Sequence, residues 1–157
     1  MRRTLSRLGP GAGWLAVICG FALPIFTISG AVDVFLKIEG VKGESQDAYH
    51  KDEIDVLSWS WGMSQSGSFH YGGGGGTGRA NVQDLAITKW IDRASPDLML
   101  KCLTGDHYPS ATLVVRKAGK VPIEYIKLDM KKILVTSVST GGSGGEDRLT
   151  ENVTFNF

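Results

Sequence analysis

Residues 149–157 read LTENVTFNF, and two chemically different sets of side chains alternate along this stretch. One set consists of every second residue: Leu149, Glu151, Val153, Phe155 and Phe157. The residues between them are all Thr or Asn. Successive side chains of a β-strand point to opposite faces of a sheet. A period of two therefore predicts a strand with one face turned toward a core.

The same period recurs from residue 32 onward. Val32, Val34, Leu36 and Ile38 alternate with Asp33, Phe35, Lys37 and Glu39. A second stretch places Leu57, Trp59, Trp61 and Met63 on one expected face and Val56, Ser58, Ser60 and Gly62 on the other. Further strands are expected around Leu85, Ile87 and Ile91, around Leu113 and Val115, and around Ile126, Leu128 and Met130.

One short helix is expected among these strands. Ser95 suits the N-cap, Pro96 suits the first helical position, and Asp97 complements the positive end of the helix dipole. Gly105 lies where a left-handed C-cap belongs. The pattern predicts an antiparallel barrel or sandwich with one helix.

Composition limits the function classes. A chain of 157 residues is one domain long, and its net charge of +1 gives no electrostatic reason to expect nucleic acid. The 21 glycines favour a β protein with open loops. Trp59, Trp61 and Trp90 fit either an interface or a packed core.

Residues 1–31 form a separate segment ahead of the predicted domain, which spans 32–157. Arg2, Arg3 and Arg7 precede an uncharged run from Leu8 to Val32, and Ser29-Gly30-Ala31 supplies small residues. Three interpretations remain open: a cleaved secretory signal, a single membrane anchor, or sequence upstream of the real start.

Motifs that resemble catalytic or nucleotide-binding sites lack the context that such sites need. The run GGSGG at 141–145 matches G-x-S-x-G, but a predicted strand follows it and no His comes later. The glycines of 72–78 match G-x-G-x-x-G without the strand–helix unit that gives that pattern meaning. His50, His70 and His107 are scattered rather than spaced as metal ligands. We therefore expect no enzyme activity, no cofactor and no metal site.

Three long stretches resemble the haemolysin-coregulated protein (Hcp) family, the tube proteins of type VI secretion machines. They are VDVFLKIEGVKGES at 32–45, IDVLSWSWG at 54–62 with the glycine run that follows, and SVSTGGSGGEDRLTENV at 137–153. They occur in the family's order, and the resemblance covers essentially everything after Ala31.

The resemblance implies a mainly β fold in which two packed antiparallel sheets form a small barrel with one short α-helix, as in phage tail-tube proteins. It implies a homohexameric ring, stacked into a secreted tube that meets sheath and spike proteins and delivers effector proteins in virulence. By position, Gly142, Ser143 and Gly144 fall in the family's channel-facing loop. Also by position, the family's loop that contacts neighbouring subunits or rings corresponds to Gly72, Gly73, Gly74, Gly75, Gly76 and Gly78.

Two departures from the family pattern shape further expectations. Members commonly start at the equivalent of Ala31-Val32-Asp33 and are cytoplasmic until the machine fires, so residues 1–31 suggest export or membrane contact instead. The alternative function is a secreted binding module of the same fold, acting outside the tube. The family also continues beyond the equivalent of Phe157, so the strand at 149–157 is expected to lack a neighbour and leave an open edge.

Overall fold

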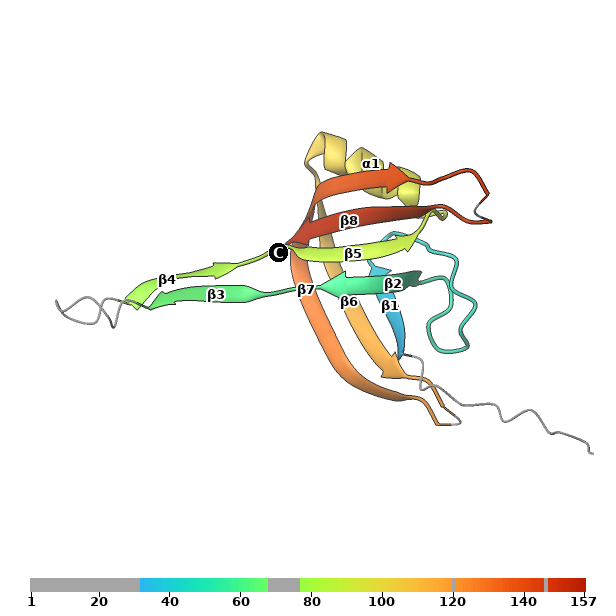
Figure 1. Cartoon of the computed structure of the whole chain (residues 1–157), viewed down its shortest axis with the longest axis horizontal. Coiled ribbons are helices and arrows are strands. Elements are labelled where there is room, and N and C mark those ends of the chain that lie inside the picture. The colour runs from blue at the N-terminus through green and yellow to red at the C-terminus, as the bar shows by residue number, and fades with distance from the viewer. Residues whose placement is uncertain (1–31, 68–76, 120, 146) are drawn as a thin grey trace, which may run out of the picture.

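Six antiparallel strands close into a barrel in the order β1-β2-β5-β8-β7-β6, and two more strands form a separate arm. The computed structural model describes residues 32–67, 77–119, 121–145 and 147–157, so the segment 1–31 and most of the glycine run lie outside the described residues. Figure 1 shows the barrel, the arm and the helix. The elements are β1 (Val32–Ile38), β2 (Ile54–Ser60), β3 (Met63–Gly67), β4 (Thr77–Val82), β5 (Leu85–Trp90), α1 (Ser95–Thr104), β6 (His107–Lys117), β7 (Ile123–Gly141) and β8 (Thr150–Asn156). The prediction of a mainly β barrel with one short helix is confirmed.

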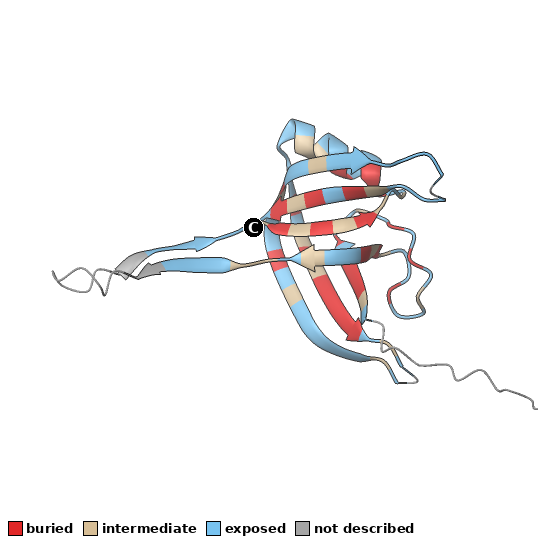
Figure 2. Cartoon of the chain, in the orientation of Figure 1, coloured by how far each residue is buried: buried red, intermediate tan, exposed pale blue. Residues whose placement is uncertain are grey.

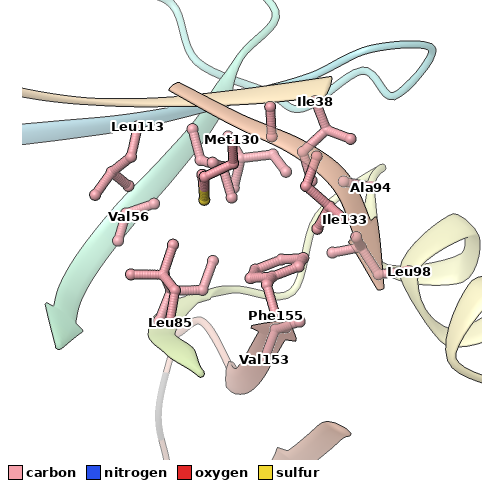
Figure 3. Close-up of a cluster of buried hydrophobic side chains, with 14 of the residues drawn as sticks. Ile38, Val56, Leu85, Ala94, Leu98, Leu113, Met130, Ile133, Val153 and Phe155 are labelled. Carbon is pink, nitrogen blue, oxygen red and sulfur yellow. The ribbon is translucent and has the colours of Figure 1, made fainter. Parts of the chain in front are cut away.

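The barrel interior holds one apolar core to which every barrel strand contributes. Along β8 the predicted alternation is confirmed, since Glu151, Val153 and Phe155 are buried while the Thr and Asn residues between them are not. Figure 2 shows the same alternation of buried and more exposed residues on neighbouring strands. Figure 3 shows Phe155 and Val153 facing the side chains of β6 and β7 across the core. Burial at this density supplies the main stabilisation of the fold.

Strand β2 departs from the predicted alternation. The pairing with β5 shifts register between Val56 and Ser58, so one extra residue interrupts the period of two. Val56 therefore faces the core before this bulge, and Trp59 packs against the core after it. The prediction that Leu57, Trp59, Trp61 and Met63 share one face is wrong. Leu57 is 44% exposed and Met63 is 63% exposed, whereas Trp59 and Trp61 pack against the core.

Helix α1 covers one end of the barrel, and its two ends differ in how well they were predicted. Pro96 lies in the first turn, and Gly105 forms the left-handed C-cap with φ 72°, both as expected. The prediction of Ser95 as N-cap is wrong, since Ala94 occupies that position and makes no side-chain cap. Ser95 is buried instead, and its hydroxyl donates to Glu151 Oε1 at 2.7 Å.

Strand β8 is paired on both sides. Its partners run from Leu85↔Phe155 to Trp90↔Thr150 on β5, and from Leu134↔Asn156 to Gly141↔Thr150 on β7. The expected open edge at 149–157 is therefore wrong. The ladder with β8 covers β7 from Leu134 to Gly141.

The arm is a two-stranded ribbon, β3–β4, that projects from the barrel (Figure 1). It pairs from Met63↔Val82 to Gly67↔Thr77, with a register shift between Gln65 and Gly67. Met63 and Val82 are both exposed, and they lie opposite each other at the base of the arm. An isolated two-stranded ribbon is at best marginally stable in water, so a partner surface would stabilise this arm.

Candidate functional site

The outer face of the sheet β2-β5-β8-β7 carries small uncharged side chains in register, and all of them except Ala86 are polar. One row runs across the four strands through Ser58, Thr88, Asn152 and Ser139. The next row runs through Ser60, Ala86, Thr154 and Ser137. None of these side chains is buried, and none is charged. The arrangement makes a hydrophilic and neutral surface.

Hydrogen bonds between strands fix the orientation of these side chains. The Thr88 hydroxyl donates to Asn152 Oδ1 at 2.7 Å, within the first row. The Thr136 hydroxyl, displaced by a bulge in β7, lies 2.8 Å from the hydroxyl of Thr154. Such cross-strand pairs stabilise the sheet and hold its outer surface in one conformation.

A single carboxylate ends the polar face on one side. Asp84 accepts hydrogen bonds from Asn156 Nδ2 at 2.8 Å and from the Thr136 hydroxyl at 2.7 Å. These bonds favour the ionised form, so the pKa of Asp84 is lowered from its ordinary value. Asp84 is therefore a fixed negative charge at neutral pH.

An aromatic–cation pair lies at the opposite end, where β5 meets the β7–β8 loop. The Arg148 guanidinium carbon lies 4.8 Å from the centre of the Trp90 ring. Trp90 pairs with Thr150, in the row next to that of Asn152 and on the opposite side from the row of Thr154. Contacts of a guanidinium with an aromatic face are attractive, so this pair holds the loop against β5.

The β7–β8 loop contains the predicted channel-facing residues. Gly142, Ser143 and Gly144 are all exposed and follow the end of β7 directly. A Cβ atom at Gly142 would lie 2.2 Å from Leu149 Cδ2, so the two sides of the loop approach closely at that point. The structure thus places these residues at one end of the polar face rather than on it.

The predicted contact loop lies mostly outside the described residues. Gly72, Gly73, Gly74, Gly75 and Gly76 all belong to the part of the chain that the structure does not describe. Gly78 lies in β4, the second strand of the arm. The described strands on both sides show that the glycine run connects the two strands of the ribbon.

A buried ion network beneath the polar face was not predicted. Lys89 Nζ lies 2.6 Å from Glu151 Oε1, 2.7 Å from Asp92 Oδ1 and 2.8 Å from the carbonyl oxygen of Trp90. Both Lys89 and Glu151 are fully buried, and they are direct partners in the β5–β8 ladder. The hydroxyl of Ser95 completes the network by accepting the backbone N–H of Asp92 at 3.0 Å. The network ties the start of α1 to the two central strands.

The outer face of β1 and β6 is charged, in contrast to the polar face. Arg116 donates to Asp33 Oδ2 at 2.9 Å and to Asp47 Oδ1 at 3.0 Å. These contacts raise the pKa of Arg116 and lower the pKa of Asp47, the hydrogen bond between them being the largest cause of both shifts. Phe35 lies under this cluster, and the His50 ring stacks on the Phe35 ring with 4.3 Å between the two ring centres. The cluster anchors the loop between β1 and β2 on the barrel.

No group of His, Cys, Asp and Glu side chains within the described ranges has the arrangement of a metal site. Nor does any helix in the described part of the chain have the length and apolar character needed to cross a bilayer.

Comparison with known proteins identifies the family. The family model described as "Type VI secretion system effector, Hcp" matches residues 35–157. Protein hcp1 of Pseudomonas aeruginosa is 65% identical over 128 residues, which cover 81% of this chain and 79% of that protein. The structure of Hcp1 from Salmonella typhimurium is 44% identical with a TM-score of 0.69, covering 81% of this chain and 82% of that one. A type VI secretion system effector from Yersinia pestis is 38% identical with a TM-score of 0.68, covering 80% and 84%. The chain belongs to the Hcp family of type VI secretion system effectors.

Proposed function

We propose that this chain is a structural tube subunit that forms a hexameric ring, and that the polar face of β2-β5-β8-β7 lines the channel of the ring. The observation that carries the proposal is the pair of uncharged rows described above. A channel wall that holds many different proteins without trapping them needs hydrogen-bonding capacity with little charge and few exposed apolar side chains. These two rows meet that requirement.

In this proposal the rings stack into a tube that type VI sheath and spike proteins surround and cap, and the channel holds effector proteins. The loop of Gly142, Ser143 and Gly144 then forms a rim of the channel, beside the Trp90–Arg148 pair. The arm, with Gly78 and the glycine run, then contacts a neighbouring subunit or ring. Family membership and the exposed, unsupported arm both favour these roles. The chain acts without catalysis and leaves the cell by the type VI route.

Electron microscopy of the full chain tests the proposal. Wild-type protein is expected to give six-fold rings with a central hole. Ser139→Trp places one indole per subunit on the polar face, at an exposed position whose loss opens no cavity. This variant should still form rings, but with density inside the hole.

Lys37→Trp is the matched control, because Lys37 is exposed on β1, outside the four-stranded polar face. Rings of this variant should keep an open hole. If Ser139→Trp rings have an unchanged hole, the polar face is not the channel wall. If the wild-type protein shows no rings at high concentration, the tube role itself is wrong.

A further inference from the structure

A pocket of about 330 Å³ lies where the turn after β1, helix α1 and the start of β6 meet. Its apolar lining comes from Val41, Leu100 and Pro109. Such side chains stabilise an aliphatic chain that enters the pocket, because both surfaces are then removed from water. The pocket shares no strand with the polar face, which is built by β2, β5, β8 and β7.

Two carboxylates line this pocket, and they come from different elements. Glu39 directly follows the last residue of β1, and Asp97 lies in the first turn of α1. Glu39 is held in place by β6, because its Oε2 accepts from the Ser110 hydroxyl at 2.7 Å and its backbone N–H donates to the Ser110 carbonyl oxygen at 3.0 Å. A recess lined by two charges of the same sign attracts an ion of the opposite sign.

Lys101 also lines the pocket, but its charge is compensated by a neighbouring carboxylate. Lys101 Nζ lies 3.2 Å from Asp106 Oδ2 and 5.8 Å from the centre of the Tyr108 ring. His107 lines the pocket too, and a histidine side chain is largely uncharged at pH 8. The lining therefore carries a net negative charge from Glu39 and Asp97 at that pH.

The hydroxyl of Tyr108 adds a third acceptor to the lining. Tyr108 is 5% exposed, and its hydroxyl has no hydrogen-bond partner among the described residues. Burial, and after it the negative charge of Asp97, raise the pKa of Tyr108 to about 12, so the hydroxyl stays neutral at pH 8. Buried hydroxyl groups usually have a partner. A donor that enters the pocket beside Asp97 would supply one.

A lysine ammonium group matches this set of acceptors. It carries one positive charge and three N–H donors that point in different directions, for two carboxylates and one hydroxyl. A guanidinium group is less suited, because its donors form a planar fork that fits a single carboxylate or phosphate. Anions are disfavoured by the charges of Glu39 and Asp97.

The exposed surface of α1 beside the pocket favours a lysine that belongs to a protein. Leu100, which lines the pocket, is 57% exposed, and Leu103 is 86% exposed. Residues three apart are neighbours on a helix surface, so apolar area continues from the pocket along α1. A free amine leaves this area in water, whereas the chain that carries a lysine can cover it.

We propose that this pocket binds the ammonium group of a lysine side chain supplied by a partner protein. The ammonium group donates to Glu39, Asp97 and the Tyr108 hydroxyl, and the aliphatic stem lies against Val41 and Leu100. The proposal goes beyond the tube function and does not depend on it, since the pocket and the polar face are built from different strands.

Saturation-transfer difference NMR with the full chain at pH 8 tests the site. The probe Nα-acetyl-lysine methylamide should bind saturably, with a Kd on the order of 1–10 mM for a single side chain. Nα-acetyl-norleucine methylamide lacks the ammonium group and should bind roughly tenfold more weakly, or worse. If Nα-acetyl-arginine methylamide binds more tightly than the lysine probe, the assignment to lysine is wrong. If n-butylamine binds as tightly as the lysine probe, the ligand is a free amine and the protein partner is wrong.

Single substitutions locate the binding of the lysine probe. Asp97→Asn and Glu39→Gln should each weaken binding roughly threefold, and Tyr108→Phe should do so by a similar factor. Lys101→Gln should tighten binding instead, because the Asp106 carboxylate then adds uncompensated negative charge beside the pocket. A damaged fold does not produce tighter binding, so the two directions separate a lost contact from a lost structure.

Asp129→Asn is the matched control, because Asp129 is a 64% exposed carboxylate on β7 that does not line the pocket. This variant should bind the lysine probe as the wild type does. A wild-type protein that does not bind the probe overturns the proposal. So does an Asp97→Asn variant with unchanged affinity, or a Lys101→Gln variant that binds more weakly than the wild type. Ring formation does not enter these affinities, so failure of the ring proposal is a different result.

Discussion

Among single side chains, the buried pair of Lys89 and Glu151 is the most consequential feature of the barrel. Both side chains occupy inward positions on strands whose other inward positions are apolar, and they face each other in the ladder. Burying an ion pair gives little net stability over an apolar pair, because desolvation offsets the attraction. Its contacts join β5, β8 and the start of α1.

Removing one partner of this pair should be far more damaging than removing both. Lys89→Met is expected to lower the free energy of unfolding by about 3–5 kcal/mol, because it leaves the Glu151 carboxylate buried without a positive partner. The double variant Lys89→Met with Glu151→Leu should recover a large part of that loss. Urea unfolding of the wild type and both variants measures this. Equal destabilisation of the single and double variants would show that the pair is not the cause.

Among the elements, the loop between β1 and β2 depends on polar contacts more than on apolar burial. Asp47 accepts from Arg116 and also from the backbone N–H of Tyr49 at 2.9 Å and of His50 at 3.2 Å. Gly43 allows the two ends of the loop to pass close to each other, because a Cβ atom at Gly43 would lie 2.3 Å from the carbonyl oxygen of Glu53. The loop therefore has a defined shape although it contains no helix or strand.

The stability contributed by Asp47 should depend on pH with a definite sign. Its pKa in the folded state is lowered from the ordinary 3.8, so its contribution is complete above that value and is lost as the pH falls toward the folded-state pKa. Asp47→Asn should therefore be less stable than the wild type at neutral pH, and the difference should shrink below about pH 4. Urea midpoints across this range measure it. Asp52→Asn, an exposed carboxylate of the same loop, is the control. A difference that persists unchanged at low pH would contradict the role of the ionised carboxylate.

At the level of the whole molecule, closure of the barrel depends on β8 lying between β5 and β7. Phe155 is 1% exposed and lies at the centre of the core, whereas Phe157 is 38% exposed and contacts Trp61 with ring centres 5.7 Å apart. Phe155 lies within β8, whereas Phe157 lies just beyond the last residue of that strand, Asn156. They therefore form a matched pair for testing what holds the barrel closed.

Phe155→Ala is expected to destabilise the protein by about 3–5 kcal/mol, because it leaves a cavity among side chains that cannot fully collapse. Phe157→Ala removes the same atoms from a partly exposed site and should cost clearly less. Thermal or urea unfolding of both variants makes the comparison. If the two variants lose the same stability, the core is not organised around Phe155 as described.

Much of the fold follows from local pattern. The alternation at 149–157 and 32–39 predicts β8 and β1, because side chains on a strand alternate whatever lies beside it. Pro96 and Gly105 predict the first turn and the end of α1, because each acts through its own backbone conformation. Three long stretches also carried the family resemblance, which the comparisons confirm.

Other features depend on which strands are neighbours and in what register, and no local pattern contains that information. The bulge in β2 changes which residues face the core, so Leu57 is exposed while Trp59 packs against the core, although alternation predicted that the two share a face. Ser95 is not the N-cap. Its hydroxyl instead donates a hydrogen bond to Glu151, which lies 56 residues away in the sequence. The neutral rows appear only when β2, β5, β8 and β7 lie side by side. These contacts join residues far apart in the chain, so their energies appear only once the barrel has closed.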